Sequence, residues 1–246
     1  MILFFDTETT GLVNFKAPSS DPSQPRLVQI GMIVCEDSGE EVFQFGAIIK
    51  PDGFEIPAKA SEVHGITNLK AKLSGIGLGI VLPIFSYWMG RCELQVCHNF
   101  KFDKAVMESE LVRVGFGYLN ALYFCTMQEM TGVCKLRQAT SNRFKWPKLQ
   151  EAYKFIFGRN FDKAHDALAD VRACKELYFW LKGQNESSAG TREAGLELAP
   201  EPNLDNLKDA FGNKIVIDHS NPVKSVPNPL YMAAPSVSVP LNLDIQ

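Results

Sequence analysis

The sequence predicts an α/β fold, in which a mixed five-stranded sheet is flanked by helices. Three β-rich segments open the chain, and a turn-like Asp37-Ser38-Gly39 joins the second to the third, which predicts an antiparallel start. The later segments alternate between short apolar runs and longer stretches of helical periodicity, as in sheets covered by helices. With 46% hydrophobic residues in 246, the chain can bury a sizeable core, and global disorder is excluded.

The first half of this domain contains three strands and one long helical stretch. Residues 1–6 form a short apolar run typical of a buried strand, and β-rich strands are expected at 26–36 and 41–50. A helical stretch is expected from about residue 68 to 90. Its most apolar part, 76–90, is shorter than the roughly 20 residues that span a bilayer and is interrupted by glycine and proline. We therefore expect a buried helix there and no membrane contact.

The second half alternates strands and helices. The expected elements are a strand at 93–99, an amphipathic helix at 101–115, a short strand at 121–125, and helices at 126–134, 147–157 and 166–181. On the amphipathic helix, Phe102, Val106, Leu111 and Val114 can share one apolar side. Pro147 suits a first helical turn, and Gly158 suits a helix end.

Composition divides the chain into a folded domain at 1–182 and a tail at 183–246. The tail contains half of the 14 prolines and no sustained periodic pattern beyond a short apolar run at 214–218, so we expect it to be mostly extended or disordered. It is also acidic, and it accounts for the net charge of −3. A histone-like polycation is excluded, and any contact with nucleic acid must come from a local basic patch.

The cysteines and the N-terminus indicate a cytoplasmic, reduced protein. The six cysteines are scattered and form no CxxC pair, which argues against a zinc ribbon or a thioredoxin motif and favours small core residues. The chain opens directly on an apolar strand, without a basic segment, a long apolar run and a cleavage site, so no signal peptide is expected.

Acidic side chains follow the ends of three predicted elements. Asp6 and Glu8 end the first strand, and positions two apart on a strand face the same side. Asp103 lies near a helix start, where the helix dipole favours an anion. Asp170 lies one turn into the last helix, after His165 and the good N-cap Asp166.

Each feature has a plain structural alternative: a polar strand end, an N-cap for Asp103, and a surface histidine for His165. Four converging carboxylates would require divalent cations, and oxygen ligands suit Mg²⁺ or Mn²⁺ better than zinc. Two such ions about 3.5–4 Å apart can hold both the attacking and the leaving oxygen of a phosphodiester, and a histidine can take the proton of the attacking water.

The motifs Phe5–Gly11 (FDTETTG), His98–Asp103 (HNFKFD) and His165–Asp170 (HDALAD), in this order, resemble the three motifs of the DEDDh 3′–5′ exonucleases. This family includes the proofreading epsilon subunit of bacterial DNA polymerase III. The segment Val63–Thr67 (VHGIT) also resembles a stretch between the first and second motifs of the family. The resemblance covers about residues 1–182.

The resemblance implies an RNase H-like αβα fold and two divalent cations, Mg²⁺ or Mn²⁺. It implies metal ligands at Asp6, Glu8, Asp103 and Asp170, and a general base at His165. It also suggests that Thr9 contacts the terminal nucleotide, that Leu12 and Phe102 wedge against bases, and that His64 and Asn99 line the cleft. Core packing is an equal alternative for Phe102.

We therefore expect a metal-dependent 3′–5′ exonuclease that releases nucleoside monophosphates from single-stranded or frayed DNA ends, in proofreading or repair. The same chemistry on RNA ends is one alternative, because two-metal hydrolysis does not itself choose the sugar. A non-catalytic, exonuclease-like adaptor of a polymerase is the other.

Three further segments have an open role. Residues 135–163 contain eight basic and two acidic side chains with Phe144, Trp146 and Tyr153 between them, which favours a path for a phosphate backbone over an ordinary solvated face. The Ser- and Pro-rich connection at 13–25 is interpreted as a loop rather than a substrate-facing flap. The chain end at 240–246 faintly resembles peptides that bind the sliding clamp, although an unattached terminus is the simpler interpretation.

Overall fold

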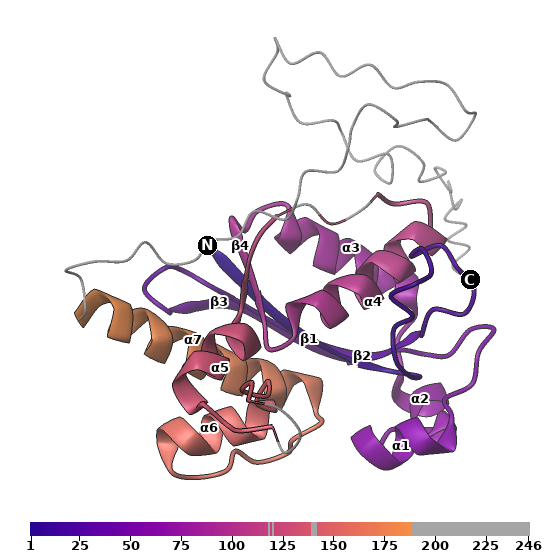
Figure 1. Cartoon of the computed structure of the whole chain (residues 1–246). Coiled ribbons are helices and arrows are strands. Elements are labelled where there is room, and N and C mark those ends of the chain that lie inside the picture. Colours follow the sequence, from indigo (N-terminus) through magenta and orange to yellow (C-terminus); the bar gives the residue numbers. More distant parts are fainter. Residues whose placement is uncertain (118, 120, 139–141, 188–246) are drawn as a thin grey trace, which may run out of the picture. The chain divides into compact units, whose positions relative to one another are not determined.

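The computed structural model describes residues 1–117, 119, 121–138 and 142–187, and within them a mixed sheet of five strands in the order β3-β2-β1-β4-β5 (Figure 1). The strands are β1 Ile2–Thr9, β2 Leu27–Cys35, β3 Glu41–Ile48, β4 Leu94–Cys97 and β5 Leu122–Cys125. Strands β1, β2 and β3 pair antiparallel, whereas β4 runs parallel to β1 and β5 parallel to β4. The predicted fold class is confirmed, including its antiparallel start.

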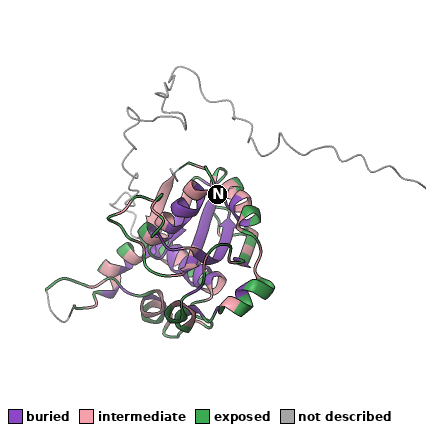
Figure 2. Ribbon diagram, turned by 90° about the vertical axis from the view of Figure 1, so that its right-hand side faces the viewer, coloured by how far each residue is buried: buried purple, intermediate pink, exposed green. Residues whose placement is uncertain are grey.

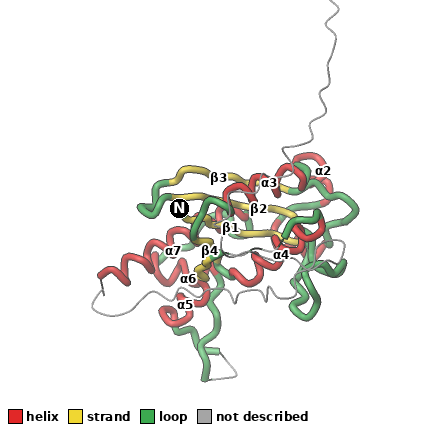
Figure 3. Tube along the Cα trace, turned by 90° about the horizontal axis from the view of Figure 1, so that it is seen from above, coloured by secondary structure: helices red, strands yellow, loops and turns green. Residues whose placement is uncertain are grey.

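Helices cover both faces of this sheet. They are α1 Ala58–His64, α2 Asn68–Ser74, α3 Leu78–Met89, α4 Phe100–Arg113, α5 Thr126–Cys134, α6 Leu149–Phe157 and α7 Ala167–Ser187. Helices α3 and α4 pack on one face, and α7 packs on the other face across β1, β2 and β4. Figure 3 shows the strands β3, β2 and β1 side by side, with the helices around them.

Alternation along β1 sends side chains into two separate cores. Leu3 and Phe5 are buried against α3 and α4, whereas Ile2 and Phe4 are buried against α7. Strands β1 and β2 are therefore buried on both sides, and the buried strands are purple in Figure 2. The same alternation continues past the core, so the even-numbered residues at the end of β1 belong to the face that α7 covers.

The predicted long helix at 68–90 is wrong, because it is divided at Gly75–Gly77. Ile76 extends the edge of the sheet: its N–H donates to the Ile48 carbonyl at 2.9 Å, and its carbonyl accepts from Lys50 at 2.8 Å. Gly75 permits this course, since a Cβ there would lie 2.3 Å from the Ala71 carbonyl oxygen. The short helix α1 was not predicted from the sequence.

Three predicted element ends also differ. Helix α6 begins at Leu149 rather than Pro147, whose carbonyl instead lies 3.0 Å from His98 Nε2. Helix α4 ends at Arg113, so Val114 leaves the apolar side and is 48% exposed. Helix α7 continues to Ser187, past the expected domain boundary at 182. The rest of the tail, 188–246, including 214–218 and 240–246, lies outside the described residues.

All six cysteines are buried and unbridged, as expected for small core residues. Among the helices of the described residues, none is both long and apolar enough to cross a membrane.

Candidate active site

Two carboxylates project from the end of the central strand β1. Asp6 lies opposite Gly31 of β2, and Glu8 lies opposite Gln29. A register shift between Glu8 and Thr9 ends the regular pairing directly after the second carboxylate. Such a bulge bends a strand and re-aims its side chains, and pairing resumes at Thr9, opposite Leu27.

Asp103 reaches this strand from the first turn of α4. It is only 3% exposed, and its Oδ1 accepts two hydrogen bonds from Thr7, from the hydroxyl at 2.8 Å and from the backbone N–H at 3.1 Å. Thr7 lies between Asp6 and Glu8 on β1 and points to the opposite face, toward α4. Alternation on one strand therefore supplies both the acidic pair and the donor that holds the third carboxylate.

Asp170 and His165 belong to the start of α7. Asp166 N-caps the helix by accepting from the Ala169 N–H at 3.2 Å, as predicted. His165 has a left-handed backbone with φ 70°, a conformation uncommon outside glycine, and its N–H donates to Asp170 Oδ2 at 3.1 Å. The histidine side chain is 58% exposed, and its Nδ1 lies 3.9 Å from Glu8 Oε1. Ligand atoms of Glu8, His165 and Asp170 all lie within 4.8 Å of one another.

A glycine in β2 lets α7 approach the sheet this closely. A Cβ on Gly31 would lie 2.4 Å from the Ala167 carbonyl carbon and oxygen, and 2.6 Å from the Leu168 nitrogen. Beside it, the Gln29 side chain accepts from the Ala167 N–H at 3.2 Å. The first turn of α7 therefore rests directly on β2, across from Asp6.

Burial, together with neighbouring negative charge, raises the pKa values of all four carboxylates. Burial is the main cause at every one, and it raises the pKa of Glu8 to about 8 and that of Asp170 to about 7. The pKa of Asp6 is raised well above its usual range by burial and then by the charges of Asp103, Asp170 and Glu8. Burial raises the pKa of Asp103 to about 7, although the two Thr7 hydrogen bonds oppose it. The cluster is therefore a site of concentrated negative potential that a cation would relieve.

This donor set fits divalent cations. Asp170 Oδ1 is buried and has no hydrogen-bond partner among the described residues, which leaves it available to an ion. Carboxylate oxygens are the donors that Mg²⁺ and Mn²⁺ prefer. Among the described residues, Glu8, His165 and Asp170 form a group that could hold such an ion.

The five residues expected to contact the substrate lie in different settings. Thr9 is buried and its hydroxyl donates to the Gly11 carbonyl at 2.7 Å, while Leu12 is 87% exposed just beyond. His64 is buried at the end of α1, and the nearby His165 contributes, after burial, to lowering its pKa. Asn99 is exposed before α4. Phe102 packs partly against the core, so both of its interpretations fit.

His98, in the second motif, does not join the cluster. It is 8% exposed, with Nδ1 2.9 Å from the Thr126 hydroxyl and Nε2 3.0 Å from the Pro147 carbonyl. Burial lowers its pKa to about 4. The neutral ring ties β4 to the segment that precedes α6.

Replacing Thr7 with valine is expected to weaken divalent-cation binding about tenfold. Valine keeps the shape but removes the hydroxyl that orients Asp103 and holds its pKa down, and loss of such a supporting hydrogen bond commonly costs 10–100-fold in metal affinity. Isothermal titration with Mn²⁺ measures the change. Thr10→Val, next to the cluster but bonded to Arg26, is the control and should leave the affinity unchanged.

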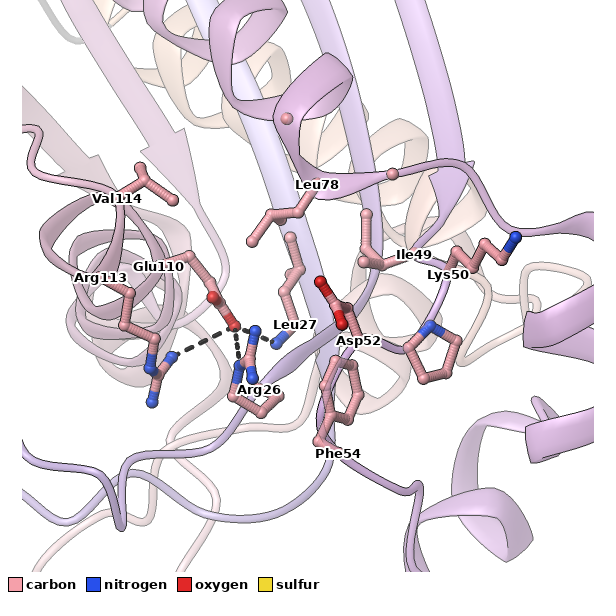
Figure 4. A pocket seen from close by; sticks show the side chains of 13 residues that line it. Arg26, Leu27, Ile49, Lys50, Asp52, Phe54, Leu78, Glu110, Arg113 and Val114 are labelled. Carbon is pink, nitrogen blue, oxygen red and sulfur yellow. Dashed lines mark hydrogen bonds and ion pairs between the residues drawn. The ribbon is translucent and has the colours of Figure 1, made fainter.

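A hollow of about 580 Å³ lies at the far end of α4, and none of the four carboxylates lines it (Figure 4). Its buried Glu110 is 1% exposed, and Oε1 accepts from Arg26 Nε and the Leu27 N–H, both at 2.9 Å, with Arg113 Nη1 at 3.2 Å. Arg26 in turn pairs with Thr10, so Glu110 anchors the chain just beyond Glu8.

Four residues that support the site were not predicted from the sequence: Thr7, Gln29, Gly31 and Glu110. For Thr7 alone, the alternation of side chains along the strand was a usable signal.

The chain was compared with solved structures, and several of the similar ones are of E. coli exonuclease I. Its zinc-bound complex with single-stranded DNA matches with a TM-score of 0.60 at 21% identity, covering 75% of this chain and 41% of that chain. The complex with dT13 has a TM-score of 0.60 at 20% identity (76% and 42% covered), and the complex with dA16 has 0.61 at 19% (76% and 41%). The match thus spans less than half of those chains, and at this identity it shows a shared fold alone.

No curated protein matches the chain. The family model described as exonuclease, of the RNase T type, matches residues 3–178, which contain all three acidic motifs and nearly all of the described residues. The chain therefore belongs to the RNase T family of exonucleases, of the DEDDh type.

Proposed function

We propose that the chain is a metal-dependent 3′–5′ exonuclease that hydrolyses phosphodiester bonds at DNA 3′ ends and releases nucleoside monophosphates. The proposed exonuclease domain is residues 1–182, with 183–246 as an appended tail. Proofreading or repair is the setting we favour. Exonucleases of this family use divalent metal ions, and Mg²⁺ or Mn²⁺, as a pair, are the ions we propose here.

The observation that supports this function best is the convergence of four carboxylates beside an exposed histidine. The charges of Asp103 and Asp170 raise the pKa values of both Asp6 and Glu8, which supports a close approach of the four carboxylates. Unpaired buried carboxylates destabilise a fold, so a cluster of four is hard to explain without a bound cation. An adaptor without catalysis would have no use for such an arrangement.

The roles of the chain's own residues follow from their positions. The four carboxylates would hold the ions, which when bound neutralise charge on the reacting phosphate and acidify water. His165 is exposed and next to Glu8, where it can accept a proton from the attacking water. Its backbone is fixed by Asp170, so the proposed base and a proposed ligand move together.

DNA is the proposed substrate. The similar exonuclease I structures include complexes with single-stranded DNA, dT13 and dA16, which supports an unpaired 3′ end as the substrate here. RNA ends remain the competing substrate class, because discrimination depends on contacts to the 2′-hydroxyl.

Digestion of 5′-labelled DNA and RNA oligomers of the same sequence, with Mg²⁺, Mn²⁺ or chelator, tests the proposal. We expect a ladder shortening from the 3′ end, mononucleotide products, faster cleavage of DNA, and no cleavage in chelator. His165→Ala is expected to slow cleavage about 10²–10⁴-fold, the usual contribution of a general base.

His219→Ala provides a histidine control in the tail, and it should cleave like the wild type. Product from internal positions would contradict an exonuclease, and shortening from the 5′ end would contradict the polarity. Absence of cleavage by the wild type with either metal would favour the adaptor.

A further inference from the structure

A hollow of about 480 Å³ lies against the first turn of α4, on the flank of the helix next to Asp103. The residues lining it include Phe15, Asn99, Lys101, Tyr123 and Trp146. They come from four separate parts of the chain: the connection after β1, the start of α4, β5, and the segment before α6. One helical turn thus presents Asp103 to the carboxylate cluster and its neighbours to this hollow.

Two large aromatic side chains at this hollow are exposed to solvent. Trp146 is 65% exposed and Phe15 is 54% exposed, although the chain has ample core for aromatic residues. A further pair, Phe100 and Tyr123, stacks with ring centroids 4.4 Å apart and planes 6° from parallel. Trp146 and Phe15 therefore offer exposed aromatic surface to a flat, apolar ring.

A positive charge lies beside the aromatic rings. Lys101 Nζ lies 4.6 Å from the centroid of the Phe15 ring, and Lys101 has no carboxylate partner within the part of the chain that the structure describes. Lys104, by contrast, is neutralised by Glu108 at 2.6 Å. A ligand that combines flat rings with single negative charges would match this pairing of groups.

The connection at 13–25 holds Phe15 in place. Gln24 Nε2 donates to the Asn14 carbonyl at 2.9 Å, and Gln24 Oε1 accepts from the Asn14 N–H at 3.1 Å. A second hollow, of about 240 Å³, shares Phe15, Lys101 and Lys104 with the first and continues along this connection. The two hollows are together called the Phe15–Trp146 groove, and none of the four carboxylates lines it.

We propose that the Phe15–Trp146 groove binds unpaired nucleobases upstream of the scissile phosphate, with Trp146 and Phe15 as stacking surfaces and Lys101 as a phosphate contact. The proposal rests on the proposed function and deepens it, because it makes the enzyme specific for strands that are single-stranded for several nucleotides. Lys101 of the groove and Asp103 both belong to the start of α4, so a strand held at the carboxylates would extend into the groove. The proposal also assigns a substrate-facing role to the connection at 13–25, which the sequence analysis interprets as a loop.

Tryptophan fluorescence tests the stacking on Trp146 directly, since Trp146 is the most exposed of the three tryptophans of the chain. Oligothymidylates of two and eight nucleotides are titrated in chelator, which prevents cleavage. We expect the octamer to quench the emission and the dimer to leave it unchanged. Trp146→Phe should remove the quenching yet retain most of the affinity, because phenylalanine still stacks.

Affinity and kinetics supply the second measurement. Trp146→Ala and Phe15→Ala should each weaken octamer binding about tenfold and leave dimer binding unchanged, as expected for the loss of one stacked base. With Mg²⁺, KM for the octamer should rise by the same factor while kcat stays within about twofold, because neither side chain touches the carboxylates. Tyr87→Ala, which removes an equally exposed aromatic (54%) from α3, is the matched control and should change nothing.

The outcomes separate this proposal from the proposed function. The groove proposal would be overturned if the groove variants weakened the binding of octamer and dimer equally. It would also be overturned if the octamer did not quench the emission of Trp146. A wild type that binds the octamer through Trp146 but cleaves nothing would support the groove and overturn the exonuclease. If the wild type cleaves DNA and the groove variants behave like Tyr87→Ala, the exonuclease function is supported and the proposed role of the groove is contradicted.

Discussion

Replacing Asp103 with asparagine is expected to reduce metal-dependent cleavage about 10³-fold or more and, at the same time, to stabilise the metal-free protein. Asparagine keeps the shape, and its Oδ1 can still accept both hydrogen bonds from Thr7. It removes a buried negative charge that raises the pKa of Asp6. The variant should therefore lose a cation ligand and lose a source of repulsion together.

The gain in stability should depend on pH in a defined direction. The pKa of Asp103 is about 7 in the folded protein against 3.8 ordinarily, so between these values the folded state binds more protons than the unfolded state. The wild type must then lose stability as the pH rises from about 4 to 7, and Asp103→Asn must not lose this contribution. Between pH 5 and pH 8, the advantage of the variant should grow by on the order of 2 kcal/mol.

Urea unfolding at the two pH values, with and without Mn²⁺, measures this prediction. Mn²⁺ should stabilise the wild type at pH 8 and should stabilise the variant much less. Glu36→Gln, which removes a charge at the β2–β3 turn, serves as the control and should show no such pH-dependent gain. A variant that is less stable than the wild type at pH 8 in chelator would show that the cluster does not hold repelling charges.

Replacing Gly31 with alanine is expected to destabilise the fold by about 3 kcal/mol or more and to separate Asp170 from Asp6. The added methyl group would meet backbone atoms of Ala167 and Leu168 at 2.4–2.6 Å, and backbone cannot move aside by changing a rotamer. Helix α7 must shift away from the sheet, and its carboxylate shifts with it. Activity should therefore fall much further than the population of folded protein.

The neighbouring glycine provides a matched control for Gly31. Gly46 pairs with Gly31 across β2 and β3, but a Cβ there would meet only the side chain of Leu168, at 3.4 Å. We expect Gly46→Ala to cost less than about 1 kcal/mol and to keep cation affinity. Thermal unfolding and Mn²⁺ titration compare the two variants. Equal losses of stability and of cation affinity in both variants would contradict the close packing of α7 on β2 at Gly31.

Local pattern was enough to predict most of the fold and the acidic part of the site. Alternation on one strand places Asp6 and Glu8 together, and capping places Asp166 at the start of a helix, because both rules act over a few residues. The break at Gly75–Gly77 was missed because it depends on pairing with Ile48 and Lys50, which periodicity within one segment does not reveal.

The supporting residues depend on contacts between distant parts of the chain. Thr7 and Asp103 are 96 positions apart, and Gln29 and Ala167 are 138 apart, so local pattern does not reveal either pairing, although alternation shows which face Thr7 takes. In the sequence, Glu110 is one of several acidic residues on an amphipathic helix. Its role follows only from the hydrogen bonds that it accepts from Arg26 and Leu27 in the folded protein. The groove shows the same limit, since Phe15 and Trp146 meet only in three dimensions.

The burial of every thiol has a consequence for the protein under oxidative stress. Burial raises the pKa of Cys97 and Cys174, so the reactive thiolate is scarce while the core is closed. Peroxide or a foreign disulfide can then reach these sulfurs only in molecules whose strands and helices have come apart. Tolerance to oxidants is thereby coupled to folding stability, and occupancy of the acidic cluster by cations, which favours the closed state, would shield the thiols from a distance.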